Sequence, residues 1–553
     1  MPHDQTNVPP AWDVLLDLAG PGPRHVRLEH ALRDAVRDGR LPPRAALPPS
    51  RSLAATLGVS RWVVTEAYGQ LVAEGTLTAR VGSATRVAGR TAARTTTPAR
   101  ATTSARATTS AGTTTSARAT TSARATSSGG AADDGAADHG AGSRRPAAES
   151  PARVATPPRR PYDLAPGVPD LRHFPRAAWV RAVRDAMRDA SDADLATGPP
   201  TGHPALQAAL RGHLAAARGV DADDVVVTTG ATDGMTRLVR ALVDAGHRAL
   251  LVEDPSWPRL RDVAVAAGLT PVPVPVDDDG VDVVALRAAG ARVGARVALV
   301  TPAHQFPCGG ALSPVRRDAL VRWAHDVDGL VVEDDYDAEF RYDRRPVAAL
   351  QALAPHRVAL LGSLSKTLGP AVGVGWLVAP PAWHDRLRDV GTPPGTLTQL
   401  TVLHLLTSGA YARHLRAART RYARRRRALL DALARHLPET SVRGLAAGLH
   451  VVVTLPVGVG ARDVVAASAA RDVTVADLGR YATGAAHPTG TALPVSGTRS
   501  RVATESLVVG YGALVDARVD EAVRRLAEAV AHVARAAPQP PSPPLPPRTV
   551  PAR

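Results

Sequence analysis

The chain has 553 residues, of which 44% are hydrophobic but only 3% aromatic, and its formal net charge is +16. Its single cysteine, Cys308, excludes an internal disulfide, and no apolar run is long enough to span a membrane. No signal peptide opens the sequence, so we expect a cytoplasmic protein. The excess of positive charge favours a polyanionic partner.

After an N-terminal extension (residues 1–23), residues 24–88 are predicted to form a compact helical unit. Its first helix has one apolar face, made by Leu28, Leu32, Ala35 and Val36. A second, short helix is predicted over Ser52–Leu57, and Gly58 makes the turn that follows it.

A third helix is predicted to start after Ser60, a residue type that caps helix N-termini well, and to end at Gly75. Its apolar face points inward and consists of Val64, Ala67, Tyr68 and Leu71. Its opposite face begins with Arg61, Trp62 and Thr65. Strands at Leu77–Arg80 and Thr85–Val87 then form a hairpin with Gly82 at its tip. The unit is therefore predicted to be a winged helix-turn-helix whose third helix is placed for the major groove of DNA.

Residues 89–160 are low in sequence complexity. The segment Ser104–Ser110 recurs at Ser116–Ser122, and the whole tract is rich in Thr, Ala, Ser and Arg. Such a composition buries too little apolar surface to offset chain entropy, so we predict a disordered linker. Residues 538–553 are rich in proline and are also predicted to be disordered.

Residues 161–537 alternate apolar strands with helical patterns, which predicts an α/β domain with a largely parallel sheet. The clearest predicted strands are Val225–Thr229, Ala249–Glu253, Val297–Thr301, Gly329–Glu333 and Val358–Leu361. A helix is predicted to follow the first of them over Asp233–Val243. The carboxyl edge of such a sheet is where α/β folds bind their ligands.

The segments that follow these strands carry the candidate ligand-binding residues. Gly230–Thr232 lie at the start of the predicted helix, where backbone amides bind phosphate. Trp257 follows a strand and either stacks on a planar ligand or belongs to the core. Asp334 and Tyr336 follow another strand. A carboxylate beneath a pyridine ring keeps the ring nitrogen protonated, and a tyrosine hydroxyl can bond to a phenolic oxygen.

Lys366 is the only lysine among the 67 lysine and arginine residues. A chain that uses arginine wherever positive charge suffices should keep lysine where arginine cannot serve, although a chance surface lysine is the alternative. A desolvated lysine amine can lose its proton and form a Schiff base with a carbonyl, whereas a guanidinium stays protonated. Lys366 follows the strand Val358–Leu361, in a turn that also contains Ser363 and Ser365. This position favours a Schiff-base lysine.

The stretch "LPPSRSLAATLGVSRWVVTEAYGQLVAEGTLTARVGSATRVA", which starts at Leu47, resembles the GntR-type DNA-binding domain nearly throughout. The residues that we place at the DNA on this basis are Arg51, Ser60, Arg61, Trp62, Thr65 and Gly82. Trp62 either packs on a sugar or a thymine methyl group or folds back on the domain.

Three further stretches resemble signatures of the MocR/GabR family of bacterial regulators: "TPAHQFPCGG", "VVEDDYDAEFRYDRRPVAAL" and "LGSLSKTLGPAVGVGWL". Members of this family join a GntR-type head to a fold type I, aminotransferase-like domain. The resemblance therefore implies a large domain with a mostly parallel sheet and a small C-terminal subdomain.

The resemblance also implies pyridoxal 5′-phosphate as the cofactor. Lys366 would be its Schiff-base lysine, Asp334 would lie at the pyridine nitrogen and Tyr336 near the phenolic oxygen. Trp257 would stack on the ring, and Arg259 would lie near the effector. The remaining cofactor contacts that we expect are Ala231 and Thr232 at the phosphate, and Ser363 and Ser365 in the lysine turn.

Three departures from the family pattern remove ligand contacts. The family usually has arginine seven residues after the lysine, where this chain has Gly373. Its usual Tyr-Gly-Asp-Pro is replaced by the stretch Thr197–Pro200. The arginine that would hold a ligand carboxylate before the last strand does not align; Ser506 lies near this position, and Arg499 and Arg501 are close to it. We therefore expect slow transaminase turnover or none.

The sequence thus predicts a pyridoxal-phosphate-dependent bacterial transcriptional regulator associated with the nucleoid. It would bind double-stranded operator DNA as a homodimer and sense a small amino compound through aldimine chemistry at Lys366. One alternative is an active aminotransferase with a DNA-binding head. Others are a sensor of pyridoxal phosphate itself and a DNA-binding scaffold whose pocket no longer holds the cofactor. No metal site is predicted.

Overall fold

The computed structural model describes residues 23–37, 39–79, 84–88, 160–342, 347–388, 390–483 and 504–536, together with Leu16 and Leu18. Several predictions fall outside these residues: those for the linker up to residue 159, the proline-rich tail, Gly82, Arg499 and Arg501. None of the helices in the described ranges is both long and apolar enough to cross a lipid bilayer.

The N-terminal unit has the predicted winged helix-turn-helix architecture. Helices α2 (Arg24–Arg37), α3 (Ser50–Thr56) and α4 (Arg61–Ala73) pack around one core and are followed by the antiparallel strands β1 (Leu77–Thr78) and β2 (Arg86–Val87). The residues predicted to face inward from α2 and α4 form this core: Leu28, Leu32, Ala35, Val64, Ala67, Tyr68 and Leu71, with Val36 packed against them.

One helix start in this unit differs from the prediction, and one predicted helix cap lacks its side-chain hydrogen bond. Helix α3 begins at Ser50, two residues earlier than expected. Ser60 occupies the predicted N-cap position of α4 in an extended conformation, but its side chain makes no capping hydrogen bond. The end of α4 agrees better, because Gly75 follows it with a φ of +80°, a conformation that favours glycine.

The C-terminal domain is built on an eight-stranded sheet with the strand order β4-β11-β10-β9-β8-β5-β6-β7. The bounds of the strands in chain order are β4 (Val226–Thr228), β5 (Ala249–Asp254), β6 (Thr270–Asp277), β7 (Gly280–Val281), β8 (Val297–Val300), β9 (Leu330–Asp335), β10 (Val358–Ser363) and β11 (Gly375–Val378). The central strands β6, β5, β8, β9 and β10 are parallel to their neighbours in this order, whereas β11 pairs antiparallel with both β10 and β4. The predicted, mostly parallel sheet is confirmed.

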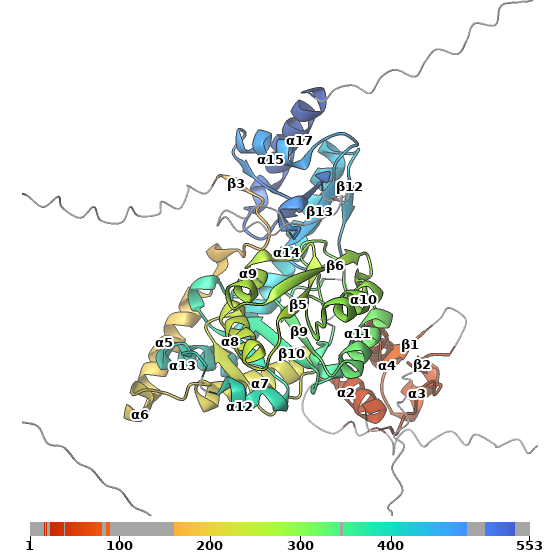
Figure 1. The fold of residues 1–553 in the computed structure, drawn as a ribbon, viewed down its shortest axis with the longest axis vertical. Helices are drawn as coiled ribbons and strands as arrows, with labels where there is room; N and C mark the ends of the chain where they lie inside the picture. The colour runs from red at the N-terminus through yellow and green to blue at the C-terminus, as the bar shows by residue number, and fades with distance from the viewer. Residues whose placement is uncertain are drawn as a thin grey trace, which may run out of the picture. The chain divides into compact units, whose positions relative to one another are not determined.

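Helices cover both faces of this sheet (Figure 1). Helices α8 (Ala231–Asp244) and α9 (Pro258–Ala266) share a core with one face. Helices α10 (Val283–Val293) and α11 (Pro314–Asp326) share a second core with the other face. Helix α8 starts at Ala231, two residues before the predicted Asp233, so the whole Gly230–Thr232 segment lies at its N-terminus.

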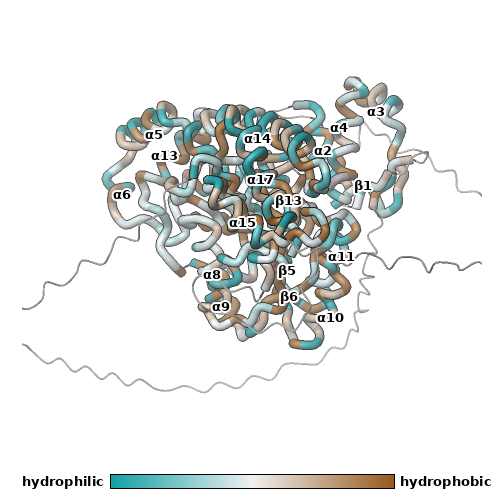
Figure 2. Tube along the Cα trace, turned by 90° about the horizontal axis from the view of Figure 1, so that it is seen from above, coloured by the Kyte–Doolittle hydropathy of each residue, from teal (hydrophilic) through white to brown (hydrophobic). Residues whose placement is uncertain are grey.

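Further helices complete this domain: α5 (Arg176–Asp189), α6 (Asp192–Leu195), α7 (Pro204–Arg218), α12 (His384–Leu387), α13 (Thr396–Thr407) and the long α14 (Ala410–His436). Figure 2 shows that hydrophobic residues concentrate along β5 and β6, whereas α14 has long hydrophilic stretches. This distribution places the core at the sheet.

The chain ends in a smaller subdomain with its own four-stranded antiparallel sheet, in the order β12-β13-β16-β15. Its elements are β12 (Ser441–Arg443), β13 (His450–Thr454), α15 (Ala461–Ala469), β15 (Ala476–Asp477), β16 (Ser506–Gly510) and α17 (Val519–Ala536). Strand β14 (Val473–Thr474) pairs in parallel with β3 (Tyr162–Asp163), which ties this subdomain to the start of the domain.

Candidate functional site

Lys366 lies in the turn between β10 and β11, at the carboxyl edge of the large sheet. Its Nζ donates a hydrogen bond of 2.6 Å to the carbonyl oxygen of Gly167. Burial lowers the pKa of this amine, and the nearby carboxylates of Asp337 and Asp334 oppose that shift. A lowered pKa increases the fraction of neutral, nucleophilic amine at a given pH.

Asp334 lies near the end of β9 and is 7% exposed. Burial raises the pKa of its carboxyl group to about 7, with a further contribution from Asp335, while Lys366 lowers it. Its Oδ1 is buried and has no hydrogen-bond partner among the described residues. A buried carboxylate oxygen without a donor is costly, so this position is suited to a ligand that brings a cationic N–H group.

Tyr336 follows Asp334 and takes part in a buried polar cluster that the sequence did not predict. Its hydroxyl lies 2.9 Å from Nδ1 of His304, and the same Nδ1 lies 3.0 Å from Oδ2 of Asp337. The rings of His450 and His304 contact each other at a tilt of 37°, with their centroids 5.0 Å apart. Burial raises the pKa of Tyr336 well above its usual range, so the phenol stays protonated.

The predicted stacking residue, Trp257, is 42% exposed at the N-terminus of α9. Its ring meets Phe306 edge-on at 5.4 Å and lies 6.4 Å from Tyr481 at an interplanar angle of 31°. Phe306 also contacts the ring of Tyr336 at 6.1 Å. These contacts form an aromatic wall that leaves part of the Trp257 ring accessible, as a stacking residue requires.

Beneath this wall, Glu253 at the end of β5 forms a second buried cluster that the sequence did not predict. Its Oε2 accepts hydrogen bonds from the Thr301 hydroxyl at 2.5 Å and from the Gln305 amide at 3.1 Å. Burial raises the pKa of Glu253 to about 7, and these hydrogen bonds oppose the shift. Glu253 therefore fixes the loop that carries Gln305 and His304.

The candidate phosphate site lies at the N-terminus of α8, whose first residues are Ala231 and Thr232. Strand register aligns Ser363 of β10 with Gly375 of β11, and Gly375 with Thr228 of β4. A Cβ on Gly375 would lie 2.7 Å from the Cα of Gly230, so glycine is needed for this close approach. The N-cap residue Gly230 has no side chain, and the first-turn carboxylate of Asp233 is already bound by the Thr229 amide and by Arg237, so an anion would bind through the amides of Ala231 and Thr232. Ser365 lies in the same turn as Lys366, and its amide donates to the Ser363 hydroxyl at 3.4 Å.

The remaining residues expected to contact a ligand make no contact with this cluster in the described structure or lack a functional group. Arg259 is exposed on the first turn of α9 and makes no hydrogen bond or ion pair with any described residue. Gly373 has a φ of +60° and, as a glycine, supplies no cation. Ser506 is buried in β16, with its hydroxyl 3.2 Å from that of Thr454.

The residues placed at the DNA lie on the exposed surface of α3 and α4. Arg51, Arg61 and Thr65 are exposed, as is the N-cap residue Ser60. Arg61 donates to the Ser50 hydroxyl at 3.4 Å, and the Thr65 hydroxyl donates to the carbonyl of Arg61. Trp62 is 60% exposed and meets the ring of His25 edge-on at 5.1 Å, so it partly folds back on α2.

Comparison with known proteins assigns both parts of the chain. Residues 25–87 match the family of bacterial regulatory proteins of the gntR type, and residues 162–475 match aminotransferase class I and II. The chain is 32% identical over 457 residues to the HTH-type pyridoxine biosynthesis transcriptional regulator PdxR of Corynebacterium glutamicum, covering 82% of this chain and 84% of PdxR. It is 30% identical over 438 residues to the probable rhizopine catabolism regulatory protein MocR of Rhizobium meliloti, covering 77% and 80% of the two chains.

Solved aminotransferases share the fold of the C-terminal domain. An archaeal alanine:glyoxylate aminotransferase matches 67% of this chain and 91% of its own, with a TM-score of 0.60 and 23% identity. LysN, the α-aminoadipate aminotransferase of Thermus thermophilus, matches 68% and 93% with a TM-score of 0.57 and 25% identity. A gntR-type DNA-binding domain joined to an aminotransferase fold makes this chain a DNA-binding regulator, and it belongs to the MocR/GabR family of transcriptional regulators.

Proposed function

We propose that the C-terminal domain binds pyridoxal 5′-phosphate at Lys366 and controls DNA binding in response to a small amino compound. The observation that carries this proposal is that the chain's one lysine lies near a buried carboxyl group whose Oδ1 has no hydrogen-bond partner among the described residues. Lys366 is the only lysine, and its amine lies near enough to Asp334 for each to shift the pKa of the other. A cofactor with an aldehyde and a pyridinium N–H group would use both residues.

The residues around this pair fit the rest of the cofactor. The uncapped N-terminus of α8, with Ala231, Thr232 and the hydroxyl of Ser363 nearby, would hold its phosphate. The accessible ring of Trp257 would cover one face of the pyridine, and the hydroxyl of Tyr336 would meet the phenolic oxygen. When bound, the cofactor supplies an aldehyde that primary amines attack and a ring that withdraws electrons.

The chain's own residues set the protonation of this site. Burial keeps a larger share of the Lys366 amine neutral, and the raised pKa of Tyr336 keeps a proton on its hydroxyl. Asp334 would lose its proton next to a pyridinium cation, because an adjacent opposite charge lowers the pKa of a carboxyl group. The buried pair of His304 and Asp337 would hold Tyr336 in position.

Effector recognition would fall to Arg259, whose guanidinium is uncommitted in the described part of the chain. Gly373 contributes no second cation, so an effector carboxylate would be held by fewer arginines than transamination usually requires. We therefore infer a sensor that binds amines and turns them over slowly or not at all.

A second candidate effector is pyridoxal phosphate itself. The similarity to a regulator of pyridoxine biosynthesis over 84% of that protein supports this reading. In that case the cofactor alone would change operator affinity, and an added amine would have no further effect. Comparing operator binding with no ligand, with pyridoxal phosphate and with pyridoxal phosphate plus amine separates the two candidates.

We further propose that the protein acts as a homodimer, which would present two heads to two half-sites of operator DNA at the nucleoid. Helix α5 supports this proposal because Val180, Val183 and Met187 are exposed at the spacing of one helix face, and Leu195 of α6 is exposed beyond them. A monomer rarely leaves such an apolar face in water.

The cofactor proposal is tested by borohydride reduction of protein loaded with pyridoxal phosphate, followed by peptide mapping. The label should appear on the peptide that contains Lys366, and both Lys366→Ala and Lys366→Arg should abolish it. Arginine keeps the charge but cannot form the covalent bond. Retention of a covalent cofactor by Lys366→Arg would refute the assignment.

A further inference from the structure

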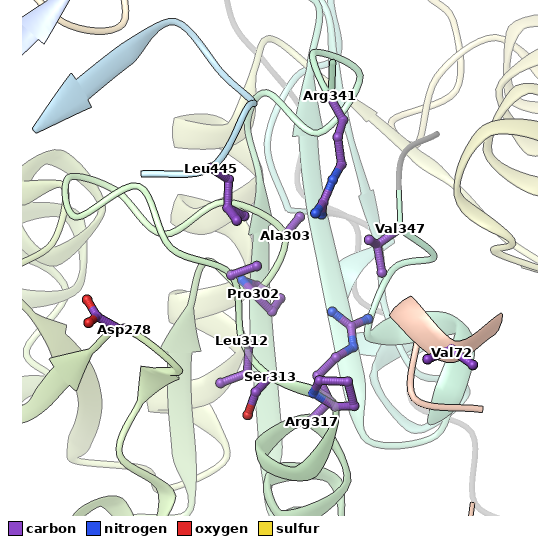
Figure 3. A pocket seen from close by; sticks show the side chains of 12 residues that line it. Val72, Asp278, Pro302, Ala303, Leu312, Ser313, Arg317, Arg341, Val347 and Leu445 are labelled. Atoms are coloured by element: carbon purple, nitrogen blue, oxygen red, sulfur yellow. The ribbon is translucent and has the colours of Figure 1, made fainter. Parts of the chain in front are cut away.

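We propose that a second pocket, lined by Arg317 and Arg341 of the aminotransferase domain and by Val72 of α4, binds a small organic anion that carries a carboxylate or phosphate group. The pocket is a cavity of about 330 Å³, shown in Figure 3. The loop after β8 contributes Pro302 and Ala303, and the segment before α11 contributes Leu312 and Ser313. None of the candidate cofactor ligands lines it, so the inference does not depend on cofactor binding.

Arg317 on α11 carries the argument because it is buried and forms no ion pair with a described residue, although the carboxylates of Glu333, Glu74 and Asp335 act on it from further away. It is 2% exposed, and its Nη2 donates to the carbonyl oxygen of Ala348 at 2.6 Å. Its Nε has no hydrogen-bond partner in the described structure. Burial lowers the pKa of Arg317, and the nearby Glu333 opposes this shift.

Arg218, in the same domain, is a buried arginine whose guanidinium is paired with a carboxylate. Arg218 is also 2% exposed, but it donates to both carboxylate oxygens of Asp335, at 2.7 and 3.0 Å. Arg317 forms no comparable ion pair with a described residue. An unpaired buried cation is costly, so Arg317 is placed to receive an anion from solution.

Two other features add positive charge at the cavity. Arg341 is 8% exposed, and Figure 3 shows its guanidinium and that of Arg317 pointing toward one another across the cavity. Ser313 is the N-cap of the 13-residue helix α11, whose first turn contains no acidic residue. The positive end of a helix adds to the attraction for an anion. Asp278 also lines the cavity, but Figure 3 places it on the side away from the two arginines.

The shape and the walls of the cavity limit the ligand. A volume of about 330 Å³ is at the lower end of small-molecule sites, so the ligand has few carbon atoms. Pro302, Leu312, Val347 and Leu445 give the cavity apolar walls for a carbon skeleton. The guanidinium of Arg317 matches the oxygens of a carboxylate or a phosphate monoester.

Occupation of this cavity would affect the cofactor site through one short loop. Pro302 and Ala303 line the cavity, and the next residue, His304, contacts Tyr336 and Asp337. Thr301, on the other side, is bonded to Glu253. A ligand that fixes this loop would change amine binding at the cofactor site, and amine binding would change its affinity by the same factor.

Calorimetric titration of the full chain, without added pyridoxal phosphate, tests the proposal. The probes are inorganic phosphate, succinate and glycerol phosphate, each compared with sodium chloride at matched ionic strength. We expect saturable binding of at least one organic anion. Arg317→Met should weaken it by about tenfold or more, because each charge-assisted hydrogen bond contributes that order of affinity.

Two further variants keep the test decisive if Arg317→Met fails to fold. Ala303→Leu fills the cavity and keeps both arginines, so it should abolish anion binding. Arg322→Gln on the exposed side of the same helix is the matched control and should bind as the wild type does. Absence of saturable binding to the wild type would overturn the proposal, as would binding that survives Ala303→Leu. Binding of phosphate but not of the organic anions would identify inorganic phosphate as the ligand source and refute the organic part of the proposal.

Discussion

Replacing Asp334 with asparagine should stabilise the cofactor-free protein at alkaline pH. The pKa of this carboxyl group is raised from 3.8 to about 7, chiefly by burial. A carboxyl group whose pKa is higher in the folded than in the unfolded state destabilises the fold most at pH values above its folded pKa. Its unfavourable contribution grows as the pH rises from 3.8 and is complete above about 7. Three pKa units correspond to about 4 kcal/mol of free energy of unfolding.

The pH dependence of this effect separates titration from packing. Asparagine does not ionise, and its own cost of burial is the same at every pH. At pH 5 only about 1.5 kcal/mol of the penalty is present in the wild type, against about 4 kcal/mol at pH 8. The difference in free energy of unfolding between Asp334→Asn and wild type should therefore shift by about 2.5 kcal/mol in favour of the variant between these pH values.

Guanidinium denaturation of cofactor-free protein at pH 5 and pH 8 measures this shift. Asp385→Asn is the control, because the Asp385 side chain is 94% exposed, and its difference from wild type should not change with pH. A pH-independent difference for Asp334→Asn would refute the reasoning. The same variant should lose affinity for pyridoxal phosphate, because asparagine cannot provide the negative charge that a pyridinium requires.

Three other changes have defined outcomes. Gly448→Ala would place a Cβ 2.1 Å from the His304 ring at a φ of +66°, so we expect a loss of about 2–4 kcal/mol in denaturation, whereas Gly458→Ala, with open space around its Cβ, should cost about 1 kcal/mol. Arg61→Ala should weaken binding to DNA fragments selected from a random double-stranded pool by about 1–3 kcal/mol, and equal affinity in a mobility-shift titration would contradict its role in reading bases. Arg259→Ala should weaken the change in cofactor absorbance caused by an amino acid more than that caused by an amine without a carboxylate, and an equal response to both would argue against a carboxylate contact.

The sequence located the strands of the sheet well but ended several of them too early. Predicted strands ended at Glu253, Glu333 and Leu361, whereas β5, β9 and β10 continue to Asp254, Asp335 and Ser363. Apolar periodicity marks the residues that the core buries, and it stops where polar residues begin. Here polar residues continue the strands because they too are buried, as the 7% exposure of both Asp334 and Asp335 shows.

The residues that support the candidate cofactor-binding side chains could not be predicted from local sequence patterns. His304 contacts Asp337 and His450, and Glu253 contacts Thr301 and Gln305, across large separations in sequence. Nothing in the spacing of the chain pairs these residues, since each pair meets only when neighbouring strands are assembled. The candidate cofactor ligands were easier to find, because each follows an apolar strand directly.

The buried carboxyl groups of Glu253 and Asp334 at the edge of the sheet lower the stability of the domain. Glu253 and Asp334 are buried carboxyl groups whose pKa values are each raised to about 7 by burial. Glu253 recovers part of this cost through hydrogen bonds to Thr301 and Gln305, whereas Oδ1 of Asp334 has no donor in the described structure. A fold selected for stability alone would place apolar residues at both positions. A bound ligand with a cationic N–H group would donate the hydrogen bond that Oδ1 of Asp334 lacks. Ligand binding should therefore raise the stability of the domain.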